Sequence, residues 1–186
     1  MEITCKTLED TEKLAQKFAL AVKDKGAFVS LYGQIGAGKT AFVKLVAKAL
    51  NVKERVTSPS FVILNEYKSG KLPIYHFDLY RLENEGVKTI LDELREYSEG
   101  KILTFVEWAE FSQDEIPFNH IKINVEYVDN CNLNSCQLIP PRPLRERVGV
   151  RGTVSRNSSE GYKHDARKYS FEAFGQENIK IIEGLK

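Results

Sequence analysis

Residues 33–40 constrain the fold of this chain more than any other stretch, because they hold glycines, a lysine and a threonine at fixed spacing. The segment reads Gly33-Gln34-Ile35-Gly36-Ala37-Gly38-Lys39-Thr40, which is the spacing of a Walker A phosphate-binding loop. A short apolar run at 27–32 precedes it, and a helical pattern at 39–50 follows it. A strand, a glycine loop and a helix in this order predict an α/β fold of the P-loop NTPase type.

Each residue type in this loop suits the binding of a nucleotide's phosphates. Glycines let consecutive backbone N–H groups face phosphate oxygens, and the start of a helix adds the positive end of its dipole. Lys39 would reach the β- and γ-phosphates, and the Thr40 hydroxyl is placed to coordinate Mg²⁺. A glycine-rich turn that binds nothing is the plain alternative. The expected nucleotide-contacting residues are Gly33, Ile35, Gly36, Ala37, Gly38, Lys39 and Thr40.

The remaining patterns predict the elements around the loop. Helical periodicity covers 8–24, 83–97 and 176–185, and strand patterns cover 101–106, 121–128 and 168–174. The runs 61–67 and 72–79 form a predicted hairpin, because a four-residue turn separates them. The 186 residues are therefore expected to form one domain, a three-layer sandwich with a mixed, mostly parallel central sheet.

Two acids follow apolar runs, Asp78 after 74–77 and Glu107 after 102–106. A P-loop needs carboxylates at the ends of nearby strands, so either acid could hold Mg²⁺ or orient the attacking water. Spacing alone does not assign the two roles, and a solvated carboxylate at a strand end is the plain alternative for each. His76 alternates with aromatic residues, and we interpret it as a packing residue rather than a base.

A hydroxyl-rich loop and a tryptophan complete the candidate site. The loop lies where many P-loop proteins sense the γ-phosphate, although a plain Ser/Pro turn fits it equally well. Its hydroxyls belong to Thr57, Ser58 and Ser60. Trp108 directly follows the second acid, which would put its ring near the nucleotide, whereas simple packing is the alternative.

Charge and composition exclude several classes of protein. Lysine and arginine total 27 against 26 acids, so no overall positive field would draw the chain to nucleic acid. The three cysteines match no zinc pattern. No apolar run approaches the roughly 20 residues of a membrane span, and the N-terminus lacks a secretory signal. We therefore expect a cytoplasmic protein without a membrane partner.

One segment differs from the rest in composition. Residues 131–162 hold five of the nine arginines, none of the eighteen lysines and three of the six prolines. The segment has no usable periodicity and too little apolar surface to offset the entropy of ordering it. We expect an insertion at about 131–163 that forms a long disordered loop between two strands.

Four runs in a fixed order give the chain a resemblance to a known family. They are residues 31–40, 57–61, Tyr75-His76-Phe77-Asp78-Leu79-Tyr80-Arg81-Leu82, and Glu107-Trp108. In them the chain resembles the bacterial TsaE proteins, P-loop ATPases of tRNA threonylcarbamoyladenosine (t6A) synthesis. The resemblance implies ATP as the nucleotide, Thr40 and Glu107 as Mg²⁺ ligands, and Asp78 as a residue needed for hydrolysis. It further implies a 57–60 loop that changes with nucleotide state, and contacts to the base near Thr11 and Asp165.

The resemblance also implies partners. Members of this family act with TsaD and TsaB, which modify the adenosine beside the anticodon. The resemblance therefore implies that this chain contacts tRNA only indirectly, through that complex. The ATP cycle would reset or support that complex. The chain departs from the family pattern between 128 and 165, where the arginine-rich segment lies.

Two other functions fit the same loop. One is a small-molecule or nucleoside kinase with a lid of Arg142, Arg145, Arg147 and Arg151. No second pocket for an acceptor is recognisable in the sequence. The other is an adaptor that binds a nucleotide without significant turnover. Acceptor-dependent ADP formation would identify the kinase, and turnover with and without TsaD and TsaB would separate the ATPase from the adaptor.

Replacing residues 131–163 by a short Asn-Gly turn is expected to preserve or slightly raise thermal stability and to leave intrinsic ATPase activity intact. Loop-closure entropy grows only slowly with loop length, so an insertion at a surface turn costs little. Thermal unfolding and ATP turnover of the shortened chain test this. Salt-dependent tRNA binding by the intact chain that is lost on deletion, while folding and ATP binding persist, would instead make the segment a basic RNA-binding arm.

Overall fold

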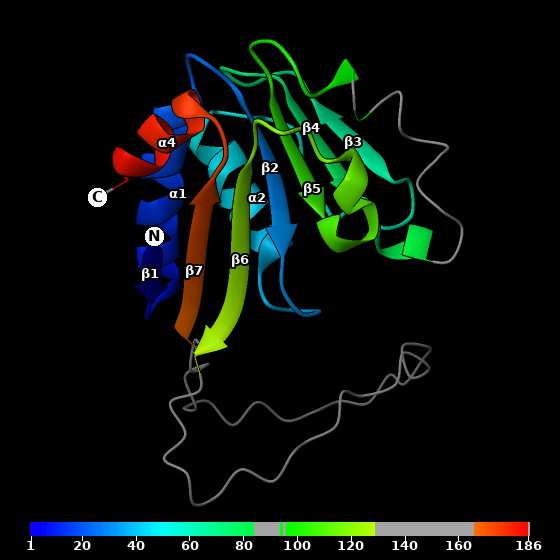
Figure 1. Cartoon of the computed structure of the whole chain (residues 1–186). Coiled ribbons are helices and arrows are strands. Elements are labelled where there is room, and N and C mark those ends of the chain that lie inside the picture. Colours follow the sequence, from blue (N-terminus) through cyan, green and yellow to red (C-terminus); the bar gives the residue numbers. More distant parts are fainter. Residues whose placement is uncertain (84–93, 95, 129–165, 186) are drawn as a thin grey trace, which may run out of the picture.

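A computed structural model of the chain describes residues 1–83, 94, 96–128 and 166–185. They form a seven-stranded sheet in the order β1-β7-β6-β2-β5-β4-β3 (Figure 1). Its strands are β1 (Glu2–Cys5), β2 (Ala27–Tyr32), β3 (Leu64–Tyr67), β4 (Ile74–Asp78), β5 (Leu103–Glu107), β6 (Ile121–Val128) and β7 (Ala166–Ala173). The described helices are α1 (Leu8–Val22), α2 (Lys39–Ala49) and α4 (Gln176–Glu183), with 3-10 segments η1 (Tyr80–Glu83) and η3 (Ala109–Glu115). The α/β class predicted from the sequence is confirmed.

The sheet is mixed, as the sequence predicts. Strands β6, β2, β5 and β4 run parallel to one another in its middle. At one edge β3 pairs antiparallel with β4, and this is the predicted hairpin. At the other edge β7 pairs antiparallel with both β6 and β1. The strands on either side of residues 129–165 are therefore hydrogen-bonded neighbours.

A capping box starts α1. The Asp10 N–H donates to Thr7 Oγ1 at 3.1 Å, and the Thr7 N–H donates to Asp10 Oδ2 at 3.0 Å. These two bonds satisfy amides that would otherwise lack partners at the helix start. Leu14, Phe18 and Val22 then recur on one buried face at helical spacing, so the amphipathic helix predicted here is confirmed.

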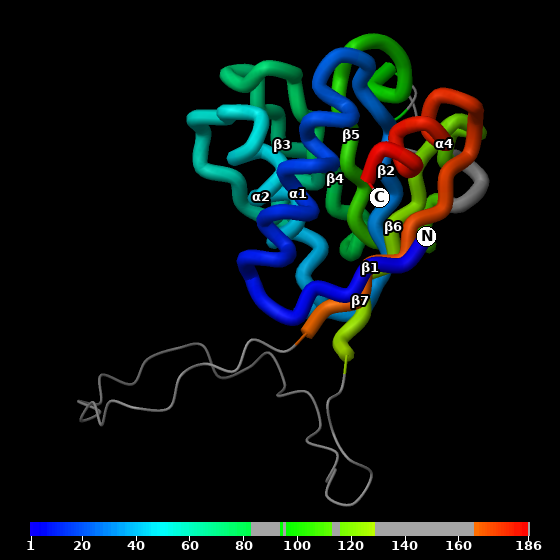
Figure 2. The backbone as a smooth tube through the Cα atoms, turned by 90° about the vertical axis from the view of Figure 1, so that its left-hand side faces the viewer, coloured from blue at the N-terminus to red at the C-terminus, as the bar shows by residue number. Residues whose placement is uncertain are grey.

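Two apolar layers enclose the parallel part of the sheet. Helices α1, α2 and α4 lie on one face (Figures 1 and 2). There the Phe18 ring packs edge-on against that of Phe42, with centroids 5.7 Å apart, and lies 6.5 Å from that of Phe105. The opposite face carries a second cluster over β2, β4 and β5, made of Phe28, Phe77, Leu79, Leu82, Leu94, Val106 and Ala109. Strands buried on both faces are typical of parallel sheets.

Two elements differ from the sequence prediction. The patterns do not predict β1, which pairs with β7 from the far end of the chain, Ile3 opposite Tyr169. The first hairpin strand begins at Leu64 rather than at residue 61, because the Val62 and Ile63 N–H groups both donate to the Pro59 carbonyl, at 2.9 and 2.7 Å. That turn takes residues out of a strand that their apolar side chains favour.

Some predictions fall outside the described residues. The helix expected at 83–97 lies mostly there, as do the insertion at 131–163 and its arginines, so these remain predictions. In the part of the chain that the structure describes, no helix is both long enough and apolar enough to cross a membrane.

The register of the parallel strands assembles the candidate site. Leu31 on β2 lies opposite Glu107 on β5, and Glu107 lies opposite Asp78 on β4. Because parallel strands end at the same edge, the loop that follows β2 reaches the same place. The two acids predicted from sequence are therefore neighbours beside residues 33–40.

Candidate functional site

The loop between β2 and α2 has a backbone that only glycine adopts without strain. Gly33, Gly36 and Gly38 have φ angles of 131°, 79° and 116°, in the region that L side chains disfavour. At Gly33 an added Cβ would lie only 2.3 Å from the Val125 carbonyl oxygen. The backbone conformation of the predicted phosphate loop therefore explains why glycine is needed at these positions, which the spacing alone did not explain.

Lys39 is buried at the start of α2, with 4% of its surface exposed. Its Nζ donates to the carbonyls of Gly33 at 2.6 Å and Gln34 at 3.1 Å, and it lies 4.0 Å from the centre of the Trp108 ring. Burial lowers the pKa of Lys39 below its ordinary value, while nearby carboxylates, Glu107 first, oppose the shift. The ammonium is held inside the loop by neutral carbonyls, which an anionic ligand could replace.

Glu107 connects the loop to β4. Its Oε1 accepts a hydrogen bond from Thr40 Oγ1 at 2.7 Å and lies 2.8 Å from His76 Nε2. His76 is fully buried and Glu107 is 3% exposed. Wherever this carboxylate is ionised it can only accept hydrogen bonds, and the shared proton is then carried by His76 Nε2. The sequence prediction that Thr40 and Glu107 form one site is consistent with this contact.

The role of His76 is what sequence reasoning missed. The sequence identifies it as a packing residue, and it is indeed buried, but its ring also contacts the predicted Mg²⁺ ligand Glu107. The available signal is its spacing of two from Asp78, since residues two apart on a strand face the same side of a sheet. Its other ring nitrogen, Nδ1, has no hydrogen-bond partner among the described residues, so the contact with Glu107 is its polar anchor.

Asp78 is bound to the hydroxyl-rich loop. Ser58 Oγ donates to Asp78 Oδ2 at 2.9 Å, and Ser60 Oγ donates to the same oxygen. The Tyr80 N–H donates to the other carboxylate oxygen, Oδ1, at 3.1 Å. Thr57, in contrast, is exposed and has its backbone N–H on the Tyr67 hydroxyl, at 3.2 Å. Of the three hydroxyl residues predicted as a sensing loop, the structure brings two to Asp78.

These groups surround one cavity of about 230 Å³. It is lined by Ile35, Gly36, Gly38, Lys39, Thr40, Ala41, Ser58, Ser60, Asp78, Tyr80, Glu107 and Trp108. Thr11, predicted near the base, is buried on α1 and is not among these lining residues, and its hydroxyl donates to the Thr7 carbonyl at 3.3 Å. Asp165 lies outside the described residues. Both remain predictions from the family resemblance.

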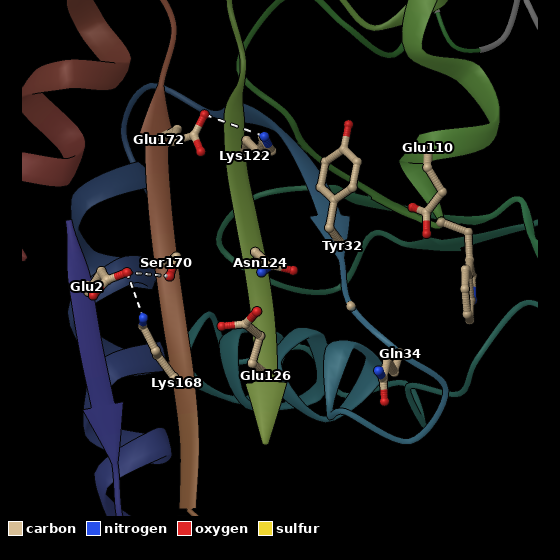
Figure 3. Close-up of a pocket in the computed structure, with 12 residues that line it drawn as sticks. Glu2, Tyr32, Gln34, Glu110, Lys122, Asn124, Glu126, Lys168, Ser170 and Glu172 are labelled. Atoms are coloured by element: carbon tan, nitrogen blue, oxygen red, sulfur yellow. Dashed lines mark hydrogen bonds and ion pairs between the residues drawn. The ribbon is translucent and has the colours of Figure 1, made fainter. Parts of the chain in front are cut away.

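A larger polar hollow of about 860 Å³ adjoins the cavity and shares Trp108 with it. Figure 3 shows it over β2, β6, β7 and β1, with charged side chains from the strands facing outward. Two lysines are paired there, Lys168 Nζ with Glu2 at 2.7 Å and Lys122 Nζ with Glu172 at 3.5 Å. The charges of the two lysines are therefore offset within the hollow.

Comparison with known proteins places these features in one family. The family model "Threonylcarbamoyl adenosine biosynthesis protein TsaE" matches residues 5–134. A tRNA threonylcarbamoyladenosine biosynthesis protein TsaE from Bacillus subtilis is 38% identical over 118 residues, which cover 63% of this chain and 72% of the relative. Its counterpart from Aquifex aeolicus is 41% identical over 113 residues, covering 59% and 77%.

A solved structure agrees with the sequence matches. The crystal structure of Bacillus subtilis YdiB superimposes with a TM-score of 0.66 at 26% identity, covering 100% of this chain and 93% of that one. The fold, the order of motifs and the family match point to the same conclusion. The chain belongs to the TsaE family of tRNA threonylcarbamoyladenosine biosynthesis proteins.

Proposed function

We propose that this protein binds and hydrolyses ATP with Mg²⁺, and that this cycle supports t6A modification of tRNA together with TsaD and TsaB partners. The observation that carries the proposal is the convergence of Lys39, Thr40, Glu107 and Asp78 on one cavity at the edge where parallel strands end. Crevices at this edge are where open α/β sheets bind nucleotides. The pathway comes from the family, whose relatives are named for threonylcarbamoyladenosine biosynthesis.

The residues present fit a magnesium nucleotide. Mg²⁺ prefers oxygen ligands and is held by one or two protein groups together with phosphate oxygens and water. Thr40 and Glu107 offer a hydroxyl and a carboxylate oxygen 2.7 Å apart. Both side chains line the same cavity, and they are the Mg²⁺ ligands that we propose. Bound Mg²⁺ would neutralise charge on the phosphates of bound ATP.

Lys39 and Asp78 have different roles in the proposed reaction. Lys39 would exchange its loop carbonyls for phosphate oxygens, which is favourable because an ion pair replaces neutral acceptors in a buried place. Asp78 would orient the attacking water by accepting a hydrogen bond from it. Since Ser58 and Ser60 bond to Asp78, movement of the 57–60 loop would change the position of that carboxylate. Loop state and hydrolysis are thereby coupled.

Lys39→Ala is expected to lower ATP turnover by about a hundredfold or more, as losses of electrostatic contacts to developing charge do. Turnover is measured with Mg²⁺, with and without TsaD and TsaB, and threonylcarbamoyl incorporation into tRNA is the second readout. Lys44→Ala, at an exposed position on the same helix, is the matched control. Wild-type affinity and turnover in Lys39→Ala would rule out the proposed site.

The two acids are expected to differ. Glu107→Gln should weaken Mg²⁺ binding by about tenfold or more, because it removes a charged ligand. Asp78→Asn should retain the nucleotide and its Mg²⁺ but lose turnover, because a water-orienting acceptor acts on the chemical step. Titrations of Mg²⁺ in the presence of nucleotide separate the two. A loss of Mg²⁺ affinity in Asp78→Asn alone would reverse the assignment.

His76 is expected to matter through Glu107. His76→Leu should weaken Mg²⁺ affinity in the nucleotide complex by about tenfold, within the range for partners of metal ligands, and leave Mg²⁺-free nucleotide binding unchanged. His76→Gln, which keeps a donor near the position of Nε2, should restore most of the affinity. In a Glu107→Gln background the effect of His76→Leu should vanish, since coupled residues are not additive. Equal losses in both backgrounds would contradict this role.

A further inference from the structure

The ends of β6 and β7 contact the outside of the P-loop. Tyr127 Oη donates to the Gly36 carbonyl at 2.6 Å, and Arg167 Nε donates to the Ala37 carbonyl at 2.8 Å. The Arg167 guanidinium also lies over the Tyr127 ring, 4.0 Å from its centre. These two residues are direct partners in the β6–β7 ladder. Two consecutive carbonyls of the loop are thus held by one pair of neighbouring side chains.

The direction of these bonds matters because a peptide group is planar. In a trans peptide the C=O and the following N–H point in opposite directions. A bond from Arg167 to the Ala37 carbonyl therefore turns the Gly38 N–H away from Arg167, and Gly38 lines the candidate nucleotide cavity. Tyr127 fixes the peptide between Gly36 and Ala37 in the same way. The N–H of that peptide belongs to Ala37 and donates to the Gln34 carbonyl at 3.1 Å.

The loop needs such support because its glycines restrict the backbone dihedral angles very little. Glycine reaches positive and negative φ with similar ease, so a glycine-rich loop loses much conformational entropy when it is ordered. A contact that orders the loop in advance removes that cost from ligand binding. Phe42 N–H bonding to Gly38 secures the α2 side of the loop, whereas Tyr127 and Arg167 secure the other side.

We propose that Tyr127 and Arg167 form a brace that sets the nucleotide affinity of the P-loop by holding the Gly36 and Ala37 carbonyls outward. The proposal rests on the nucleotide-binding function proposed above. Tyr127 is 40% exposed and Arg167 is only half-buried, while Val125 and Tyr169, two residues further into the same two strands, belong to the core. The brace therefore extends past the core, so its loss should change the loop more than the stability of the fold.

Arg167 also lies beyond residues 5–134, the part that the family model matches. The Walker A motif and its neighbours are recognisable from the family pattern alone, whereas the brace requires a strand that follows residues 129–165 in the chain. Its two members are the next-to-last described residue of β6 and the second residue of β7. The affinity of the phosphate loop would thus depend on the positions of the two strand ends that flank that segment.

The test compares Tyr127→Phe, Arg167→Met and the control Lys168→Met in the full chain. Lys168 neighbours Arg167 but faces the opposite side of the sheet, where it pairs with Glu2. Calorimetry with ADP in the absence of Mg²⁺ should show affinity about threefold weaker for Tyr127→Phe and about tenfold weaker for Arg167→Met, as expected for lost neutral and charged hydrogen bonds. Lys168→Met should bind as the wild type does. Melting temperatures of the three variants should agree.

Hydrogen–deuterium exchange of residues 33–40 in nucleotide-free protein tests the brace apart from the proposed function. Exchange there should be faster in both brace variants and unchanged in Lys168→Met. Unchanged exchange in the brace variants, or faster exchange with unaltered ADP affinity, would overturn the brace. An affinity difference that disappears at high salt would identify Arg167 as a distant charge rather than a brace. Failure of the wild type to bind ADP, with exchange altered as expected, would count against the proposed function alone.

Discussion

Parallel pairing of β2, β5 and β4 is the constraint on which the candidate site depends. The register places Leu31, Glu107 and Asp78 side by side at one edge, and residues 33–40 follow the first of these strands. Because side chains alternate along a strand, a slip of one residue in β4 would turn His76 and Asp78 to the other face of the sheet. The apolar cluster on that face, with Phe77 and Val106, penalises such a slip. Hydrophobic burial therefore fixes the positions of the polar groups.

Burying the two carboxylates of the site costs free energy of solvation, which hydrogen bonds within the site offset. Asp78 and Glu107 are each 3% exposed, and a buried carboxylate is unfavourable without compensating bonds. Hydroxyls supply much of that compensation, from Thr40 to Glu107 and from Ser58 and Ser60 to Asp78. Hydroxyls and the Lys39 ammonium can also bond to phosphate or to water around a metal ion. In the proposed nucleotide complex, the same groups would therefore bond to different partners.

Family membership and geometry contribute different parts of the functional picture. The TsaE match covers the loop, both acids and Trp108 within residues 5–134, and it connects the chain to threonylcarbamoyladenosine biosynthesis. The geometry adds how these groups support one another, with His76 on Glu107 and the 57–60 loop on Asp78. It also adds the contacts of Tyr127 and Arg167 with the loop. Residues that orient others are recognised by contacts rather than by motif, because many side chains can donate a hydrogen bond.

The sequence by itself determined the elements whose signals are local. The Walker A spacing, the capping box at Thr7 and the apolar periodicity of α1 each depend on residues a few positions apart, so the loop, its flanking strand and helix, and the pairing of β3 with β4 could be predicted. Tertiary structure alone decided what depends on distant segments. The edge strand β1 exists because β7 pairs with it, and His76 meets Glu107 because β4 and β5 lie in parallel register. Arg167 reaches a loop about 130 positions earlier, at Ala37, for a similar reason. Such contacts follow from strand order and register, which burial of the whole core sets and no short stretch of sequence encodes.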